Sequence, residues 1–273
     1  MGGLETVIIL WEACIIPSLL NSFGTWVEIS KTTGNKLNDL QKWFSRLILQ
    51  VPKSTPSASL TWKTGMMDMK LRIWKEKLNL VLHLRSLNDE TLAKKIYNEQ
   101  RKQGWPGLAK ETKNICEVLG VEDVNTTQMN KNEYKKSVNG ALKIKDEEYL
   151  KKEAESKRKC EKIMMENYGK KEYIGKRKVG EVRNIFKARV GMTEFADNFG
   201  KDKRFLRTKW MCRCGDERES ENHIMKECPI YEDIRMQYED LKDDMQLAHF
   251  FTKVLERRDL VDDRDRSRYP SFG

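Results

Sequence analysis

Residues 210–229 read WMCRCGDERESENHIMKECP, and this stretch decides how the C-terminal part of the chain folds. Cys212, Cys214, His223 and Cys228 follow the spacing Cys-x-Cys-x8-His-x4-Cys. Three thiolates and one imidazole form a complete tetrahedral ligand set for zinc, and a shell filled by protein is typical of structural sites. We therefore predict one structural zinc ion. Accidental clustering of buried cysteines is the alternative.

The residues around the ligands favour a zinc knuckle at about 210–231. Gly215 follows the second cysteine, where a tight turn tolerates positive φ. His223 and Cys228 are five apart, so the chain has to leave a helix near Cys228. Pro229 suits the first turn of a new helix, which we expect to continue to Leu241.

The charge of the chain is unevenly distributed. The 273 residues are 38% hydrophobic and 34% charged, with a net charge of +10. Residues 151–210 hold 19 Lys and Arg against 9 Asp and Glu, whereas residues 216–273 hold 10 against 16. A basic segment before an acidic tail favours a polyanionic partner, RNA or DNA, because cations displace counterions from phosphates. Lys-rich solvated helix faces are the alternative.

The six cysteines favour a reducing compartment, the nucleus or cytoplasm, over secretion. Three lie in the predicted metal site and the others, Cys14, Cys116 and Cys160, are scattered, which argues against a disulfide framework. The apolar segment at residues 6–20 is too short to span a bilayer, and we predict no membrane partner.

Apolar periodicity predicts a mainly α fold. We expect helices at 4–15, ending near Pro17, and at 35–50, 66–87, 89–103 and 179–195. Residues 125–132 read as a loop, and residues 145–168 as a charged, mostly solvated helix or a coiled coil. The predicted domains are a helical bundle at 1–103, a charged linker with helical segments at 104–178, and a module at 179–273. The module comprises a basic helix, the knuckle, a following helix and an acidic tail.

Candidate nucleic-acid-binding residues are the cations of the first bundle and of the basic segment. They are Lys36, Lys42, Arg46, Lys176, Arg177, Lys178, Arg183, Lys187, Arg189, Lys201, Lys203, Arg204, Arg207 and Lys209, together with Trp210. The indole of Trp210 can stack on a base or can cap the knuckle's own core.

No pattern in the chain indicates an enzyme. There is no Ser or Cys triad, phosphate-binding glycine loop or nucleotide motif. The paired aspartates in Leu260-Val261-Asp262-Asp263 lack a preceding strand, so we interpret them as part of a solvated tail. No catalytic residue is therefore assigned.

Two stretches resemble the C-terminal third of the reverse transcriptase of non-LTR retrotransposons. The first resembles its thumb region in Ala13-Cys-Ile-Ile-Pro17-Ser-Leu-Leu, Gly24-Thr-Trp26, Leu40-Gln41, Arg46-Leu-Ile-Leu and Pro52-x-x-Thr-Pro56. The second resembles its zinc knuckle in Phe186-Lys-x-Arg189-x-Gly-Met192, Asn198-Phe, the cysteine and histidine set, and Cys228-Pro-x-Tyr231-x-x-x-Arg235.

The resemblance implies a thumb-like helical bundle that contacts primer and template, with RNA or an RNA–DNA hybrid as the favoured ligand. The fingers and palm of that family, with their catalytic aspartates, have no counterpart in this sequence. We therefore expect a binding fragment without polymerase activity. A protein-interaction or self-associating helical module is one alternative, and a remnant of a retroelement without a function is another.

Overall fold

The computed structural model describes residues 3–25, 30–155, 169, 171–193, 211–215, 218–241 and 243–262. Within these ranges the secondary structure is helical, and the only β-bridge joins Met211 to Arg218. The prediction of a mainly α fold is confirmed. None of the helices in this part of the chain has the length and apolar character that crossing a membrane requires.

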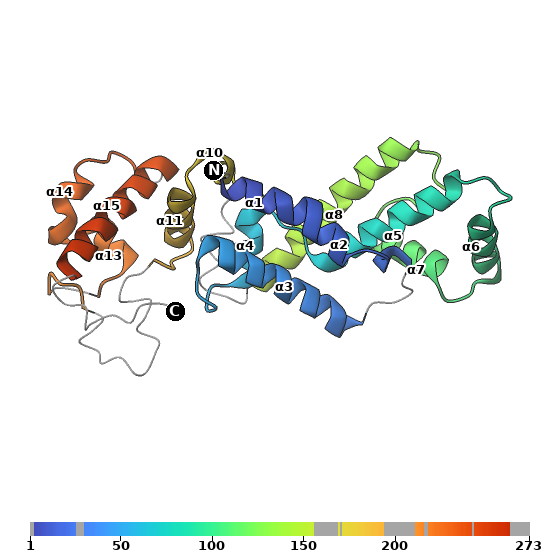
Figure 1. The fold of residues 1–273 in the computed structure, drawn as a ribbon, viewed down its shortest axis with the longest axis horizontal. Helices are drawn as coiled ribbons and strands as arrows, with labels where there is room; N and C mark the ends of the chain where they lie inside the picture. Colours follow the sequence, from blue (N-terminus) through green and yellow to red (C-terminus); the bar gives the residue numbers. More distant parts are fainter. Residues whose placement is uncertain are drawn as a thin grey trace.

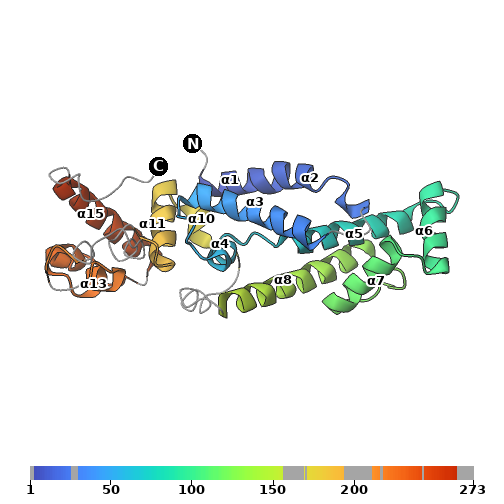
Figure 2. The same ribbon diagram turned by 90° about the horizontal axis from the view of Figure 1, so that it is seen from below.

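The helices form an elongated arrangement (Figure 1). At one end lie α6 (Leu92–Gln103) and α7 (Leu108–Leu119), and at the other end lie α13 (Glu221–Lys226), α14 (Glu232–Arg235) and α15 (Asp244–Asp262). Between the two ends, α5 (Met69–Ser86) and α8 (Lys131–Glu155) pack against each other (Figure 2).

The first helix does not end at Pro17 as predicted. It runs through α1 (Leu4–Leu10), a π-helical turn η1 (Trp11–Ile15) and α2 (Ile16–Leu19). In η1 the backbone N–H of Ile16 donates to the carbonyl of Trp11, five residues back. This wider turn relieves the clash that a proline ring otherwise makes with the carbonyl four residues before it, so the helix continues past Pro17.

The predicted second helix is α3 (Lys31–Leu49). It begins earlier than the apolar pattern indicates because the Ser30 hydroxyl accepts a hydrogen bond from the backbone N–H of Thr33, at 3.1 Å. A short 3₁₀ turn, η2 (Phe23–Thr25), precedes α3 in the chain. The helix α3 ends where Gln50 adopts a left-handed conformation, and α4 (Ser57–Thr64) follows after residues 51–56.

The second half of α8 is more buried than the sequence indicates. Residues 145–168 were expected to be mostly solvated, but Asp146, Leu150 and Ala154 are buried at four-residue spacing along one face of α8. This prediction is wrong for residues 145–155, because three positions on one face suffice to anchor a helix that is otherwise charged. Residues 156–168 lie outside the described ranges.

The C-terminal helices also differ from the prediction. After α10 (Glu172–Lys176) and α11 (Val179–Arg189), the helix expected to reach Leu241 consists only of η5 (Pro229–Tyr231) and α14. The acidic tail expected at the end of the module contains α15, which buries Leu247, Phe250, Phe251 and Val254 at the spacing of one helix face. This buried apolar face was not predicted from the sequence.

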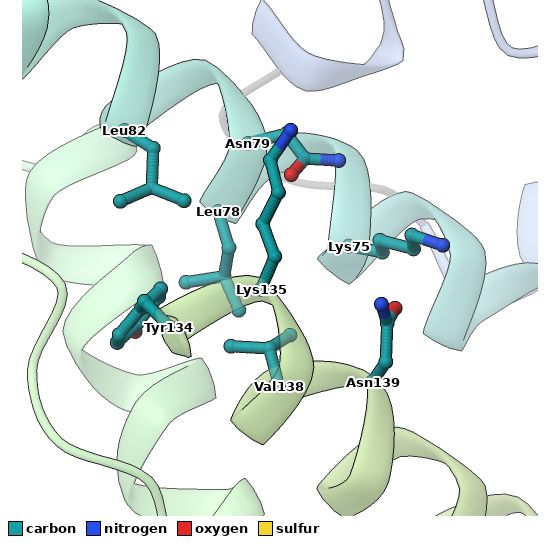
Figure 3. A pocket seen from close by; sticks show the side chains of 8 residues that line it. All are labelled: Lys75, Leu78, Asn79, Leu82, Tyr134, Lys135, Val138 and Asn139. Carbon is teal, nitrogen blue, oxygen red and sulfur yellow. The ribbon is translucent and has the colours of Figure 1, made fainter. Parts of the chain in front are cut away.

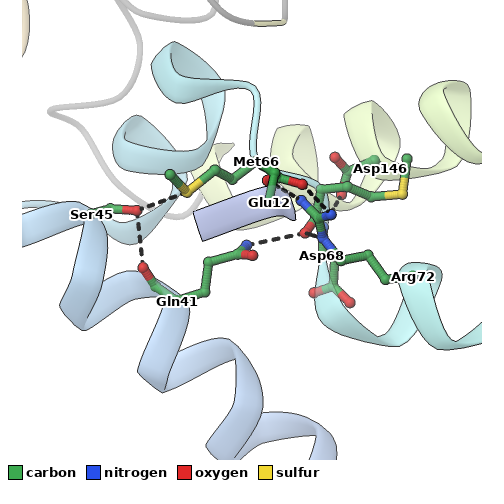
Figure 4. Close-up of polar contacts among 8 residues, drawn as sticks. Glu12, Gln41, Ser45, Met66, Asp68, Arg72 and Asp146 are labelled. Atoms are coloured by element: carbon green, nitrogen blue, oxygen red, sulfur yellow. Dashed lines mark hydrogen bonds and ion pairs between the residues drawn. The ribbon is translucent and has the colours of Figure 1, made fainter. Parts of the chain in front are cut away.

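A polar network fixes the middle of the molecule (Figure 4). The guanidinium of Arg72 on α5 forms two hydrogen bonds of 2.6 Å with the carboxylate of Glu12 in η1. The side-chain amide of Gln41 on α3 donates to the carbonyl of Met67 at 3.0 Å, and the backbone N–H of Asp68 donates to the carboxylate of Asp146 on α8 at 3.0 Å. The start of α5 is thereby joined to three other helices.

The buried apolar residues form three clusters. The first cluster joins α1, α3 and α4 to the end of α8 and to α10 and α11. The second cluster joins α5, α6 and α7 to the start of α8. The third cluster lies around residues 212–254. The second cluster includes residues on both sides of position 104, where the sequence places a boundary. The division at 1–103, 104–178 and 179–273 stays a prediction.

A buried ion pair joins α5 to α7 and yields a test of this packing. Lys77 has no exposed side-chain surface, and its ammonium lies 2.5 Å from the carboxylate of Glu111, which is 25% exposed. We expect Glu111→Ala to destabilise the chain by roughly 2–3 kcal/mol, because it leaves a buried charge without its partner. The measurement is the free energy of unfolding in urea.

Adding Lys77→Met to Glu111→Ala removes the buried charge and should restore most of the lost stability. Glu117→Ala, at an exposed position of the same helix, is the control and should have little effect. Equal destabilisation by Glu111→Ala and Glu117→Ala would contradict this role of the pair.

Candidate metal centre

The structure brings the four predicted ligands together. One ligand atom from each of Cys212, Cys214, His223 and Cys228 lies within 4.8 Å of all the others. The two sulfurs of Cys212 and Cys228 are 3.5 Å apart, and Cys214 Sγ lies 3.2 Å from His223 Nε2. This geometry is compatible with a single metal ion bound by all four residues.

A tight turn positions the first two cysteines. Gly215 has a φ of +85°, and its backbone N–H donates to the carbonyl of Cys212 at 2.9 Å. The bridge between Met211 and Arg218 closes the surrounding loop. The positive φ predicted for Gly215 is therefore present, and it folds the backbone so that both thiols lie on the same side.

The short helix α13 positions the other two ligands. The Ser220 hydroxyl caps this helix by accepting from the backbone N–H of His223 at 3.1 Å. The helix ends at Lys226, and the N–H of Cys228 returns to the carbonyl of His223 at 2.8 Å. The chain thus leaves the helix before Cys228, as the five-residue spacing predicts, and Pro229 opens η5.

The site is largely buried, with Cys214 as its one half-buried ligand. Cys212, His223 and Cys228 are at most 3% exposed. Burial raises the pKa of the Cys212 and Cys228 thiols. A divalent cation offsets this effect because it stabilises the thiolate form directly. The arrangement suits a metal that organises the fold.

The second ring nitrogen of His223 and an ion pair lie next to the ligands. His223 Nδ1 lies 4.0 Å from the carboxylate of Glu227, which is beyond hydrogen-bond distance. A buried ion pair of 3.2 Å between Glu219 and Arg258 joins the ligand loop to α15. The sequence analysis did not identify Glu219 or Arg258 as residues of the site. The apolar repeat of α15 was the signal that could have indicated a helix packed against the ligand loop.

Three of the predicted nucleic-acid-binding arginines make contacts within the chain instead of lying at the metal centre. Arg46 donates to the carbonyl of Thr55 at 3.2 Å, and Arg183 donates to the carbonyl of Ile48 at 2.9 Å. Burial lowers the pKa of Arg46 and Arg183. Arg189 pairs with Asp244 on α15 at 2.9 Å. These contacts join helices and contribute to the fold.

The other cationic candidates differ in exposure. Lys36, Lys176 and Lys178 are exposed, and Lys176 pairs with Glu172. Lys42, Arg177 and Lys187 are half-buried. Lys201, Lys203, Arg204, Arg207, Lys209 and Trp210 lie outside the described residues.

In comparisons with protein families, with curated proteins and with solved structures, nothing matches this chain. The function is therefore argued from the metal centre, the charge distribution and the packing of the chain.

Removing one ligand tests the shared ion. We expect Cys228→Ser to abolish stoichiometric metal in the purified chain, because three remaining ligands no longer close the shell. Elemental analysis gives metal content per chain. Cys14→Ser is the matched control, since Cys14 is an exposed thiol far from the cluster in the sequence and should leave metal content unchanged. Full metal retention in Cys228→Ser would contradict the assignment.

Metal removal should open the C-terminal module before the rest of the chain. The third apolar cluster includes two of the ligands, Cys212 and Cys228, together with Phe250, Phe251 and Val254 of α15. We expect a chelator to raise amide hydrogen exchange across residues 218–258 while α5 and α8 stay protected. Unchanged exchange in α15 after complete metal loss would show that the module does not need the ion.

Proposed function

We propose that this chain is a nucleic-acid-binding module stabilised by one structural zinc ion. We further propose that it corresponds to the C-terminal portion of a non-LTR retrotransposon reverse transcriptase, without the polymerase centre. RNA or an RNA–DNA hybrid is the favoured ligand, on the grounds of that resemblance.

Zinc is the proposed ion because of the donor set. Sulfur and imidazole nitrogen are the ligands zinc prefers in structural sites, and Zn–S distances of ~2.3 Å imply sulfurs roughly 3.7 Å apart around a tetrahedral ion. The spacing of 3.5 Å between the sulfurs of Cys212 and Cys228 agrees with this value. Four protein ligands leave no position for a reactive water, which supports a structural role over a catalytic one.

The observation that most supports nucleic-acid binding is that the two described residues flanking the basic stretch 194–210 both lie at the metal module. Thr193, the last described residue before that segment, donates its backbone N–H to the carboxylate of Glu221 on α13 at 3.1 Å. Met211 resumes the described chain next to the ligand Cys212. The residues on either side of the segment 194–210, Thr193 and Met211, thus both lie at the metal module. Five of the cationic candidates lie between them in the sequence, and such a concentration of cations favours a phosphate partner.

A second candidate function is protein interaction or self-association. Two apolar side chains of the first helix are exposed, Leu10 of α1 by 55% and Ile15 of η1 by 45%. On α3, Trp43 is exposed by 55% and Leu47 by 58%. The two helices are in contact, because Trp11 stacks on Phe44 with ring centroids 3.9 Å apart. Exposed apolar side chains on adjacent helices favour a protein partner. Light scattering distinguishes the two functions, because a monomer that binds RNA supports the first.

The proposed function predicts binding that weakens steeply with salt. We expect the full chain to bind a short single-stranded RNA, with affinity falling as potassium chloride rises. Replacing Lys201, Lys203, Arg204, Arg207 and Lys209 by Gln should reduce the slope of log affinity against log salt by up to about 3. Filter binding measures both, and metal content should stay unchanged.

The control replaces five exposed lysines elsewhere, Lys102, Lys110, Lys113, Lys136 and Lys143, by Gln. It matches the change in net charge and should reduce the slope much less. A flat salt dependence of the unmodified chain, or equal effects of the two variants, would contradict the assignment of the basic segment as the contact.

A further inference from the structure

A pocket of about 190 Å³ lies between α5 and α8, away from the metal centre (Figure 3). Its apolar floor consists of Leu78 and Leu82 from α5 and of Tyr134 and Val138 from α8. Its rim is polar and consists of Lys75, Asn79, Lys135 and Asn139. None of these residues was a candidate from the sequence.

Helical spacing explains why the rim is polar and the floor is apolar. On both helices a lysine is followed four residues later by an asparagine, so each pair lies on one face. Figure 3 shows Lys135 extending from α8 toward Asn79 of α5, and Asn139 directed toward the side where Lys75 lies. The two helices thus bring two ammonium groups and two side-chain amides to one opening.

The positive charge of the rim is not neutralised by the described part of the chain. Some lysines of these helices pair with acids, such as Lys77 with Glu111 and Lys145 with Glu148 at 3.0 Å. Lys75 and Lys135 form no ion pair with any described residue. Two cations facing one opening favour an anionic ligand.

The volume of the pocket and its hydrogen-bond donors indicate which class of anion fits. Ammonium and amide N–H groups all donate hydrogen bonds, which suits the several acceptor oxygens of a phosphate. A complete nucleotide or cofactor needs a pocket of roughly 300 Å³ or more. A volume of about 190 Å³ leaves room for a single phosphate group together with the edge of an attached sugar on the apolar floor.

We propose that this pocket binds one backbone phosphodiester of the nucleic acid. The inference rests on the proposed function and adds a contact on the helical body, separate from the basic segment that precedes the metal ligands in the sequence. A nucleic-acid strand bound both at this pocket and at the basic segment would lie in one direction along the molecule. Phosphate contacts of this kind do not discriminate between base sequences.

The test uses the full chain and compares two charge-matched double variants. We expect K75Q/K135Q to bind a short single-stranded RNA about tenfold more weakly than the unmodified chain, with a slope of log affinity against log salt reduced by roughly 1. K136Q/K143Q removes two exposed lysines of α8 outside the pocket and should leave affinity and slope close to the original values.

A second measurement needs no substitution at the pocket. On addition of the same RNA, the side-chain amide resonances of Asn79 and Asn139 should shift, whereas those of Asn98 and Asn114, which are exposed on α6 and α7, should not.

Normal binding by K75Q/K135Q, or unshifted Asn79 and Asn139 amides with bound RNA, overturns the pocket and leaves the proposed function in place. Absence of RNA binding by the unmodified chain overturns both proposals.

Discussion

The C-terminal module depends on four ligand atoms that lie within 4.8 Å of one another, two of them from residues of the third apolar cluster. Three sulfurs at this separation repel one another once ionised, so a shared cation is the natural counter-charge. The turn at Gly215, the cap at Ser220 and the exit before Pro229 each position one or two ligands. The ligand loop and α15 are joined in one cluster, because Phe250 and Phe251 pack with Cys212 and Cys228, so an ion bound by the four ligands would stabilise both.

The helical body is held together differently, by two long helices that take part in more than one apolar cluster. Met69 and Ile73 of α5 belong to the first cluster, whereas Leu78 belongs to the second; α8 likewise contributes Leu150 to the first and Leu142 to the second. These shared helices, together with the Arg72–Glu12 pair, give the body a continuous core. The same two helices form the pocket whose rim is set by Lys75 and Lys135.

Residue spacing and apolar periodicity predicted those features that a single short stretch of sequence determines. The metal ligands follow from donor chemistry and spacing, and α3 follows from apolar periodicity. Features that depend on distant partners could not be predicted in this way. Arg183 lies in a basic segment and was predicted to be a surface cation, yet it donates to the carbonyl of Ile48, which is 135 residues away and which only the tertiary fold brings near. The apolar face of α15 is present in the sequence as a helical repeat, but the acidic composition of this part of the chain obscured it.

The π-helical turn at Trp11–Ile15 sets the rotational phase of the first helix. An α-helix advances about 100° per residue, so apolar positions three or four apart stay on one side. Leu4, Ile8 and Trp11 are buried at that spacing, but the next buried residue is Ile16, whereas Ile15 is 45% exposed. The additional residue in the turn resets the phase, and Ile16 and Leu20 therefore face the same core as Leu4. Loss of one residue here would rotate the start of the chain out of register, so length matters more at this turn than side-chain identity.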